Sequence, residues 1–100
     1  MGEQIALPFL NMTTLVVHRN GPHDVYIGRP GIWGNPYIIG DHGTRAEVIE
    51  MYRHHLLSSP ELLKLLPTLK DKTLGCWCKP NACHGDVIAE LADKSSLLTF

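Results

Sequence analysis

The stretch from Thr73 to Asp93 reads TLGCWCKPNACHGDVIAELAD. Its first six residues, 73–78, predict a strand, and the turn cluster Lys79-Pro80-Asn81 ends it. From residue 86 to residue 93, valine, isoleucine, leucine and alanine recur on one stripe, which predicts an amphipathic helix. A strand that leads through a turn into a helix indicates an α/β arrangement.

The residues upstream predict two more strands and two more helices. Residues 45–57 are apolar at helical spacing after Thr44, and Glu47 completes a capping box at their start. Because helices separate the early strands from the last one, at least part of the sheet is parallel. We therefore expect an α/β fold: a small single-layer, mostly parallel sheet of about three or four strands with helices packed on it, as in Rossmann-like proteins. The other predicted elements are strands at 13–18 and 25–27, an ordered loop at 28–36, a short extended segment at 37–39, and a helix from Pro60 that Pro67 ends or bends.

Length and composition indicate one soluble domain. One hundred residues are enough for one domain and too few for two, so we expect a single domain over 1–100. Residues 1–12 show no clear periodicity and are interpreted as an N-terminal extension. With 44% hydrophobic and 19% charged residues, the chain is expected to fold without a partner.

Charge and hydropathy argue against two classes of partner, nucleic-acid backbones and membranes. The net charge is −1, and Lys64, Lys70, Lys72 and Lys79 are interleaved with Glu61 and Asp71, so generic binding to a nucleic-acid backbone is not expected. No window approaches the ~18 apolar residues of a membrane span, and residues 1–10 do not form a secretory signal. We therefore expect no membrane association and a cytoplasmic location. The leucine-rich run 56–69 is interpreted as core or as the face of a homodimer.

The chemistry is concentrated in one short segment. Cys76, Cys78, Cys83 and His84 fall within nine positions, and an odd number of cysteines argues against a closed disulfide framework. Strand periodicity places Cys76 and Cys78 on one face. Cys83 and His84 lie where the chain turns into the last helix.

One interpretation of this segment is a reactive pocket. The helix start and Lys79 lower the pKa of Cys83 toward a thiolate, and His84 or Asp86 acts as base or orienting group. Cys76 and Cys78 then line the floor of the pocket.

Two other interpretations stay open. Cys76, Cys78, Cys83 and His84 are a complete set of zinc ligands, although the adjacent Cys83 and His84 would both have to face one ion. Alternatively, Cys76 and Cys78 are small buried hydrophobes and His84 is a capping side chain.

A second group of candidates lies in the loop at 28–36. Arg29, in a glycine-rich loop after a strand, suits a bidentate hold on a phosphate or carboxylate. Trp33 or Tyr37 could stack on a flat ring, with Asn35 in the same motif. The structural alternatives are that Trp33 anchors the core and that Arg29 pairs with an acidic side chain.

These motifs resemble those of a family catalogued as domain of unknown function 4326, which is found in phage and bacterial genomes. The resemblance covers about residues 14–93 and implies no particular activity. The Cys-His segment is also similar to the end of another α/β family, in which Cys-His-Arg follows a strand cysteine. Gly85 takes the place of that arginine, which weakens the transfer of a phosphate-binding role. The matching elements are Tyr26-Ile27-Gly28-Arg29-Pro30, Trp33-Gly34-Asn35-Pro36, the helix with Arg45 and Tyr52, Leu74-Gly75-Cys76-Trp77-Cys78-Lys79-Pro80, and Cys83-His84-Gly85-Asp86.

Together the motifs predict one pocket, formed where the loop at 28–36 meets the turn at 78–86. We expect it to bind or act on a small anionic, nucleotide-like ligand, with Arg29 holding the anion and Cys83 as the thiolate of a thiol-dependent enzyme. The alternative is a non-enzymatic interaction module stabilised by zinc, the cofactor for which ligands are present. If the chain is encoded by a phage, the expected cytoplasm is that of the host.

Overall fold

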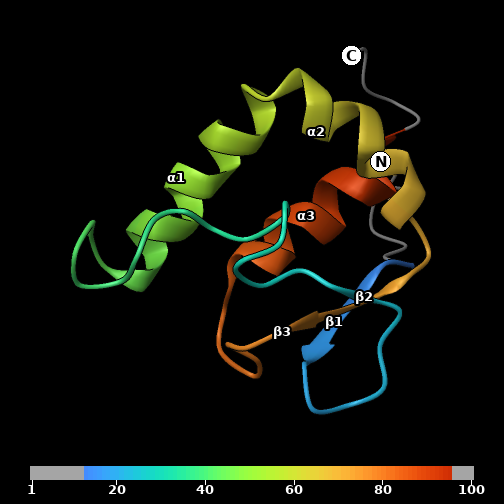
Figure 1. Ribbon diagram of the computed structural model, residues 1–100, viewed down its shortest axis with the longest axis horizontal. Helices are drawn as coiled ribbons and strands as arrows, with labels where there is room; N and C mark the ends of the chain where they lie inside the picture. Colours follow the sequence, from blue (N-terminus) through green and yellow to red (C-terminus); the bar gives the residue numbers. More distant parts are fainter. Residues whose placement is uncertain (1–12, 96–100) are drawn as a thin grey trace, which may run out of the picture.

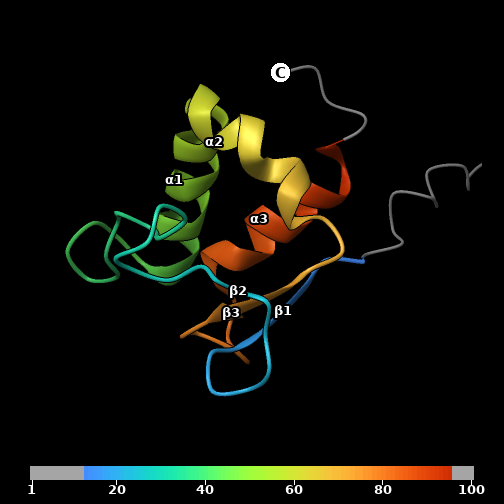
Figure 2. The same ribbon diagram turned by 45° about the vertical axis from the view of Figure 1, so that its right-hand side comes forward.

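The computed structural model describes residues 13–95, so the predicted extension at 1–12 lies outside the described part of the chain. The described residues form one small sheet with its helices gathered on one side (Figures 1 and 2). In the order of the chain the elements are β1, β2, α1, α2, the 3-10 helix η2, β3 and α3. The predicted α/β class is confirmed.

The sheet is parallel throughout, with β3 between its two partners. Its order is β1 (Leu15–His18), β3 (Thr73–Cys76), β2 (Val25–Tyr26), and each outer strand pairs in parallel with β3. The register sets His18 opposite Cys76 at one end of the β1–β3 pair. The long connection through two helices makes this parallel pairing between β2 and β3 feasible, as the sequence predicted.

The structure corrects two predictions of extended backbone. Residues 37–39 form no strand of the sheet: Ile39 makes only an isolated bridge to Gly43. Gly40 and Gly43 have positive φ angles and reverse the chain at once, so the segment pairs with its own turn. In addition, β3 ends at Cys76 and not at Cys78, because the chain enters a turn in which the Asn81 N–H donates to the Cys78 carbonyl at 2.8 Å.

The helices begin where capping chemistry predicts. In α1 (Arg45–Leu57), the Glu47 N–H donates to the Thr44 hydroxyl at 3.2 Å, and the Thr44 N–H donates to the Glu47 carboxylate at 2.8 Å. This capping box confirms the predicted helix. The next helix, α2 (Pro60–Leu65), continues into η2 (Leu66–Leu69), so Pro67 tightens the chain into a 3-10 turn before it ends.

The last helix, α3 (His84–Asp93), starts two residues earlier than the stripe predicted and packs closely on the sheet. A Cβ atom on Gly85 would lie 2.7 Å from Ile27 Cδ1 and 2.9 Å from Val16 Cγ1. Only glycine lets the helix start this close to the strands. The position therefore has no room for the arginine found in the second family that the sequence resembled.

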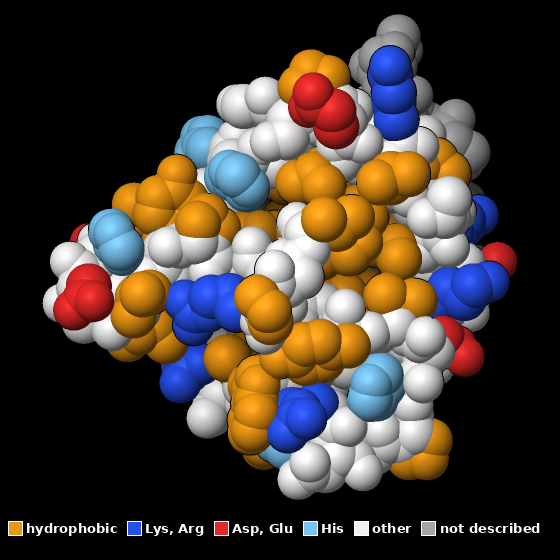
Figure 3. All heavy atoms as spheres, viewed as in Figure 1, with side chains coloured by type: hydrophobic (Ala, Val, Ile, Leu, Met, Phe, Trp, Pro, Cys, Tyr) orange, Lys and Arg blue, Asp and Glu red, His pale blue; other side chains and the backbone are white. Residues whose placement is uncertain are grey.

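The core lies between α3, α1 and the sheet. Tyr52 is fully buried, and its hydroxyl donates to the Trp33 carbonyl at 2.8 Å, which ties α1 to the loop before it. Outside the core, hydrophobic side chains extend across the face seen in Figure 3, with basic groups among them and acidic side chains toward its edge. The buried cluster comprises Ile27, Trp33, Tyr52, Leu56, Leu66, Leu69, Leu74, Cys76, Cys83, Val87, Ile88, Leu91 and Ala92.

A carboxylate joins the two ends of the described chain. Asp93, the last residue of α3, accepts hydrogen bonds from the backbone N–H and hydroxyl groups of Thr13 and Thr14, at 2.7–3.3 Å. The buried Thr14 hydroxyl also accepts from the Asp71 N–H at 2.9 Å. Between residues 13 and 95, no helix has the length and apolar character needed to cross a membrane.

Candidate functional site

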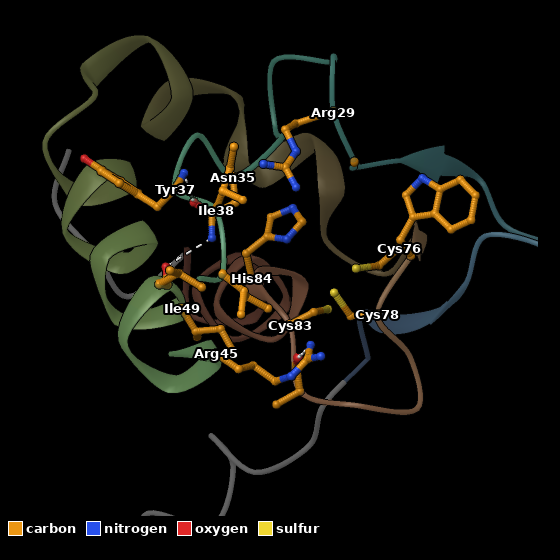
Figure 4. A pocket seen from close by; sticks show the side chains of 15 residues that line it. Arg29, Asn35, Tyr37, Ile38, Arg45, Ile49, Cys76, Cys78, Cys83 and His84 are labelled. Atoms are coloured by element: carbon orange, nitrogen blue, oxygen red, sulfur yellow. Dashed lines mark hydrogen bonds between the residues drawn. The ribbon is translucent and has the colours of Figure 1, made fainter. Parts of the chain in front are cut away.

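A pocket of about 320 Å³ opens between the loop after β2 and the turn after β3 (Figure 4). Arg29 and Cys83 both line it, so the two motifs predicted to converge do so in the structure. The arrangement follows from the parallel sheet, because the carboxyl ends of neighbouring parallel strands meet at one edge. The lining residues are Gly28, Arg29, Asn35, Tyr37, Ile38, Ile39, Arg45, Val48, Ile49, Cys76, Trp77, Cys78, Ala82, Cys83 and His84.

One group of side chains in the lining, which we call the Cys–His cluster, consists of Cys76, Cys83 and His84. All three are buried, and one ligand atom from each lies within 4.8 Å of the others. Cys76 ends β3, Cys83 precedes α3 as its N-cap, and His84 is the first helical residue. The half-buried Cys78, labelled in Figure 4, lines the same pocket but does not belong to this cluster.

The imidazole of His84 is oriented by the backbone. Its Nε2 atom lies 2.8 Å from the carbonyl oxygen of Ile27. A carbonyl only accepts, so Nε2 carries the hydrogen and Nδ1 of the neutral ring keeps its lone pair. The ring also meets the ring of Tyr52 edge-on, with centroids 4.9 Å apart. The free nitrogen of a fixed imidazole is thus available as base or ligand.

The two buried thiols share a hydrogen bond and titrate as a pair. The hydrogen bond from Cys83 lowers the pKa of Cys76, and His84 and the backbone at Cys78 act in the same direction against the effect of burial. The hydrogen bond to Cys76 and burial raise the pKa of Cys83. The sequence pointed to Cys83 as the thiolate, and the opposite directions of these two shifts favour Cys76 as the more acidic thiol of the pair.

Two predicted site residues bind each other. The Lys79 ammonium and the Asp86 carboxylate form an ion pair, and the second Asp86 oxygen accepts the Cys83 N–H at 3.1 Å. Neither side chain belongs to the lining of the pocket. Asp86 therefore caps the start of α3 and holds the turn that carries the cluster.

Two guanidinium groups flank the cluster. Arg29 is exposed, and its guanidinium has no hydrogen bond or ion pair with any other residue between 13 and 95, although its backbone carbonyl accepts from the Tyr26 hydroxyl at 3.0 Å. Arg45 donates through Nη1 to the Ala82 carbonyl at 3.1 Å, which ties the start of α1 to the turn after β3. In Figure 4 they lie on opposite sides of His84.

The other two residues of the predicted loop motif are structural in different ways. Trp33 is 6% exposed and belongs to the core, so Tyr37 and not Trp33 offers an aromatic ring to the pocket. Asn35 is buried: its amide donates to the Val48 carbonyl at 3.1 Å, and its oxygen accepts the Tyr37 N–H at 2.9 Å. Asn35 thereby positions the pocket wall that carries Tyr37.

The profile of a domain of unknown function, DUF4326, matches residues 13–94. The chain belongs to this family. It is 40% identical over 75 residues to an uncharacterized 12.4 kDa protein in the nrdA-td intergenic region of Enterobacteria phage T4, a match covering 71% of this chain and 68% of that protein. It is 36% identical over 86 residues to an uncharacterized protein of Acanthamoeba polyphaga mimivirus, covering 68% and 65% of the two chains. No solved structure matches.

The sequence therefore identified the DUF4326 family and part of the pocket lining. Arg45 and the apolar wall of Ile38 and Ile49 were not among the predicted site residues. The position of Arg45 directly after the Thr44 cap could have indicated a site residue. A helix that starts beside a glycine-rich loop projects its first side chains toward that loop. Nothing in the sequence marks the two isoleucines as site residues, since an apolar residue is normally predicted to lie in the core.

Proposed function

We propose that the pocket binds a small anionic, nucleotide-like ligand and holds it against the Cys–His cluster. The observation that carries this proposal is that Arg29, a guanidinium without a partner in the described chain, lines the same pocket as the buried thiols and His84. A free guanidinium at the edge of a pocket suits a phosphate or carboxylate, which it can bind in a bidentate manner.

The dimensions and walls of the pocket fit such a ligand. A volume of about 320 Å³ lies at the lower end of small-molecule sites, which favours a mononucleotide over a dinucleotide. Tyr37, Ile38 and Ile49 supply an aromatic ring and apolar surface for a flat base. Arg45 adds a second positive charge close to the cluster.

The enzymatic form of the proposal has a thiol of the cluster as nucleophile. Cys76 hydrogen-bonds to Cys83, and a ring nitrogen of His84 lies within 4.8 Å of both sulfurs, which is an arrangement that can activate a thiol. A ligand seated over the cluster would then protect Cys76 and Cys83 from alkylation by iodoacetamide, while Lys79 and Asp86 hold the turn.

Isothermal titration calorimetry with a set of nucleoside 5′-monophosphates tests the proposal, with the uncharged nucleosides and inorganic phosphate as reference ligands. We expect saturable binding of at least one nucleotide and about 10- to 100-fold weaker binding to Arg29→Ala, the loss of one charge-assisted contact. Lys64→Ala is the control, because Lys64 is an exposed cation on α2 that does not line the pocket. If no nucleotide binds, or both variants bind like the wild type, the proposal is wrong.

A zinc-stabilised interaction module is the second candidate, favoured by the convergence of Cys76, Cys83 and His84. In such a module the metal supplies folding energy, so a chelator unfolds the protein. Circular dichroism of the purified protein before and after EDTA distinguishes the module from a ligand-binding pocket on an independent core.

A further inference from the structure

The Cys–His cluster has the composition and placement of a metal site. We propose that Cys76, Cys83 and His84 bind one zinc ion whose fourth coordination position opens into the pocket. Two thiolates and an imidazole are ligands that zinc prefers, and three protein ligands with an open fourth position are typical of reactive zinc sites. The inference does not depend on the nucleotide-like ligand, because all three donors belong to this chain, but it excludes the thiol nucleophile of the enzymatic form, since the metal would occupy both thiolates.

The distances suit a tetrahedral ion. Zinc bonds of about 2.3 Å to sulfur and 2.0–2.1 Å to nitrogen place neighbouring donors about 3.4–3.8 Å apart. The sulfurs of Cys76 and Cys83 and one ring nitrogen of His84 already lie within 4.8 Å of one another. Closing them around an ion therefore takes side-chain adjustments of about 1 Å, with no movement of β3 or α3.

The backbone explains how adjacent residues face one ion. Along an extended chain, successive side chains point to opposite faces, which made the pair Cys83 and His84 doubtful as joint ligands. Cys83 is extended, with φ −150° and ψ 170°, whereas His84 is the first residue of α3. The change from extended to helical backbone at this point turns both side chains into the pocket lining.

His84 carries the outer contact that zinc-bound histidines use. A ligating imidazole generally donates its other N–H to a carboxylate, a backbone carbonyl or water, which fixes the tautomer and orientation of the ring. Here Nε2 donates to the Ile27 carbonyl at 2.8 Å, and Nδ1 is left as the donor to the metal. This contact is present before any ion arrives.

The charges of the site balance. Zn²⁺ with the thiolates of Cys76 and Cys83 and a neutral His84 has no net charge, as a buried position requires. Nearby, Lys79 and Asp86 neutralise each other in their ion pair. The positive charges of the two pocket arginines then remain available to an anion above the metal.

An open fourth coordination position distinguishes this zinc site from the closed site of a structural module. Cys78 is half-buried and does not belong to the group whose donors are all within 4.8 Å. A structural site would use Cys78 and close the coordination sphere. The open site proposed here leaves that position to water or to a ligand in the pocket.

The test uses the whole chain and the metals alone. Protein purified without chelator is analysed for zinc by mass spectrometry, and metal-free protein is titrated with Co²⁺, whose thiolate charge-transfer absorption reports the number of sulfur ligands. We expect one equivalent of metal and two thiolates. Cys76→Ser, Cys83→Ser and His84→Gln should each weaken zinc binding at least about 100-fold, since loss of an outer contact alone costs up to that much. Cys78→Ser is the matched control and should keep one equivalent of zinc.

A second measurement needs no variant. Peptide mapping after alkylation of the wild type should show that Zn²⁺ protects Cys76 and Cys83 but leaves Cys78 reactive. Absence of tight zinc or cobalt binding overturns the proposal. Loss of zinc from Cys78→Ser, or protection of all three cysteines, shows a closed site and overturns the open fourth position. Because no nucleotide is present, neither result depends on the function proposed for the pocket.

Discussion

The carboxylate of Asp93 offers the sharpest test of how the fold is held. It accepts hydrogen bonds from Thr13 and Thr14 and so fixes the end of α3 to the start of β1. In Asp93→Ala these acceptors are lost together. Thr14 is 2% exposed, so water cannot replace the lost partner of its backbone N–H without opening the structure.

The magnitude follows from the two bonds to Thr14, since the exposed bonds to Thr13 contribute little. Hydrogen bonds to a charged group are each worth about 1.5–3 kcal/mol, and an orphaned buried donor costs about 1–3 kcal/mol. We expect Asp93→Ala to lower the free energy of unfolding by about 3 kcal/mol. At about 4–8 °C per kcal/mol for a domain of this size, Tm falls by about 12–24 °C.

Urea unfolding followed by circular dichroism, together with calorimetry, measures both quantities. Asp41→Ala is the control, an exposed loop carboxylate that should stay within about 0.5 kcal/mol of the wild type. Thr14→Val should destabilise less in the Asp93→Ala background than alone, because the two residues share the contact. A loss below about 1 kcal/mol for Asp93→Ala, or additive double-variant effects, would refute this account.

Three further predictions concern the packing around the site. Tyr52→Phe leaves the Trp33 carbonyl without its buried donor and should cost about 1–3 kcal/mol in urea unfolding. Gly85→Ala inserts a methyl group against the sheet, and overpacking of about 1–3 kcal/mol should exceed the gain in helix propensity of about 1 kcal/mol, with reduced Tm as the readout. Burial opposes ionisation of Glu90, yet Arg53 holds the pKa of this carboxyl below its usual value. The ion pair therefore contributes a small stabilisation, below about 1 kcal/mol, at pH values above the usual pKa of the carboxyl. This stabilisation is lost as the pH falls through the lowered pKa. Glu90→Gln should remove that part of the acid-induced loss in urea unfolding between pH 5 and 3.

The parts of the fold that local chemistry determines were predictable from the sequence. The helix at 45–57 was predicted with its bounds, since its cap and its apolar spacing are both encoded within a few residues. The length of β3 was overestimated, because its end depends on where a turn begins and not on β propensity. The segment at 37–39 was predicted as extended, and two glycines of positive φ prevent it from reaching the sheet.

Within the site, the chemical residues were predictable and their roles less so. Cys76, Cys83 and His84 stand out by type and spacing. The fate of Trp33 could not be read locally, since an indole in a loop serves equally as core anchor or ligand platform until its neighbours are known. That the surroundings shift the pKa values of Cys76 and Cys83 in opposite directions likewise requires knowing that the two sulfurs lie close together.

Two separate stretches of chain supply different parts of the pocket. Its sulfur and imidazole groups come from residues 76–84, held between a central strand and a helix, whereas much of the wall that meets a ligand comes from the irregular stretch at 28–39. Substitutions in that irregular stretch can change the shape and charge of the entrance without disturbing the sulfurs. A relative that differs in this stretch is therefore expected to keep the Cys–His cluster while presenting an entrance of another shape and charge.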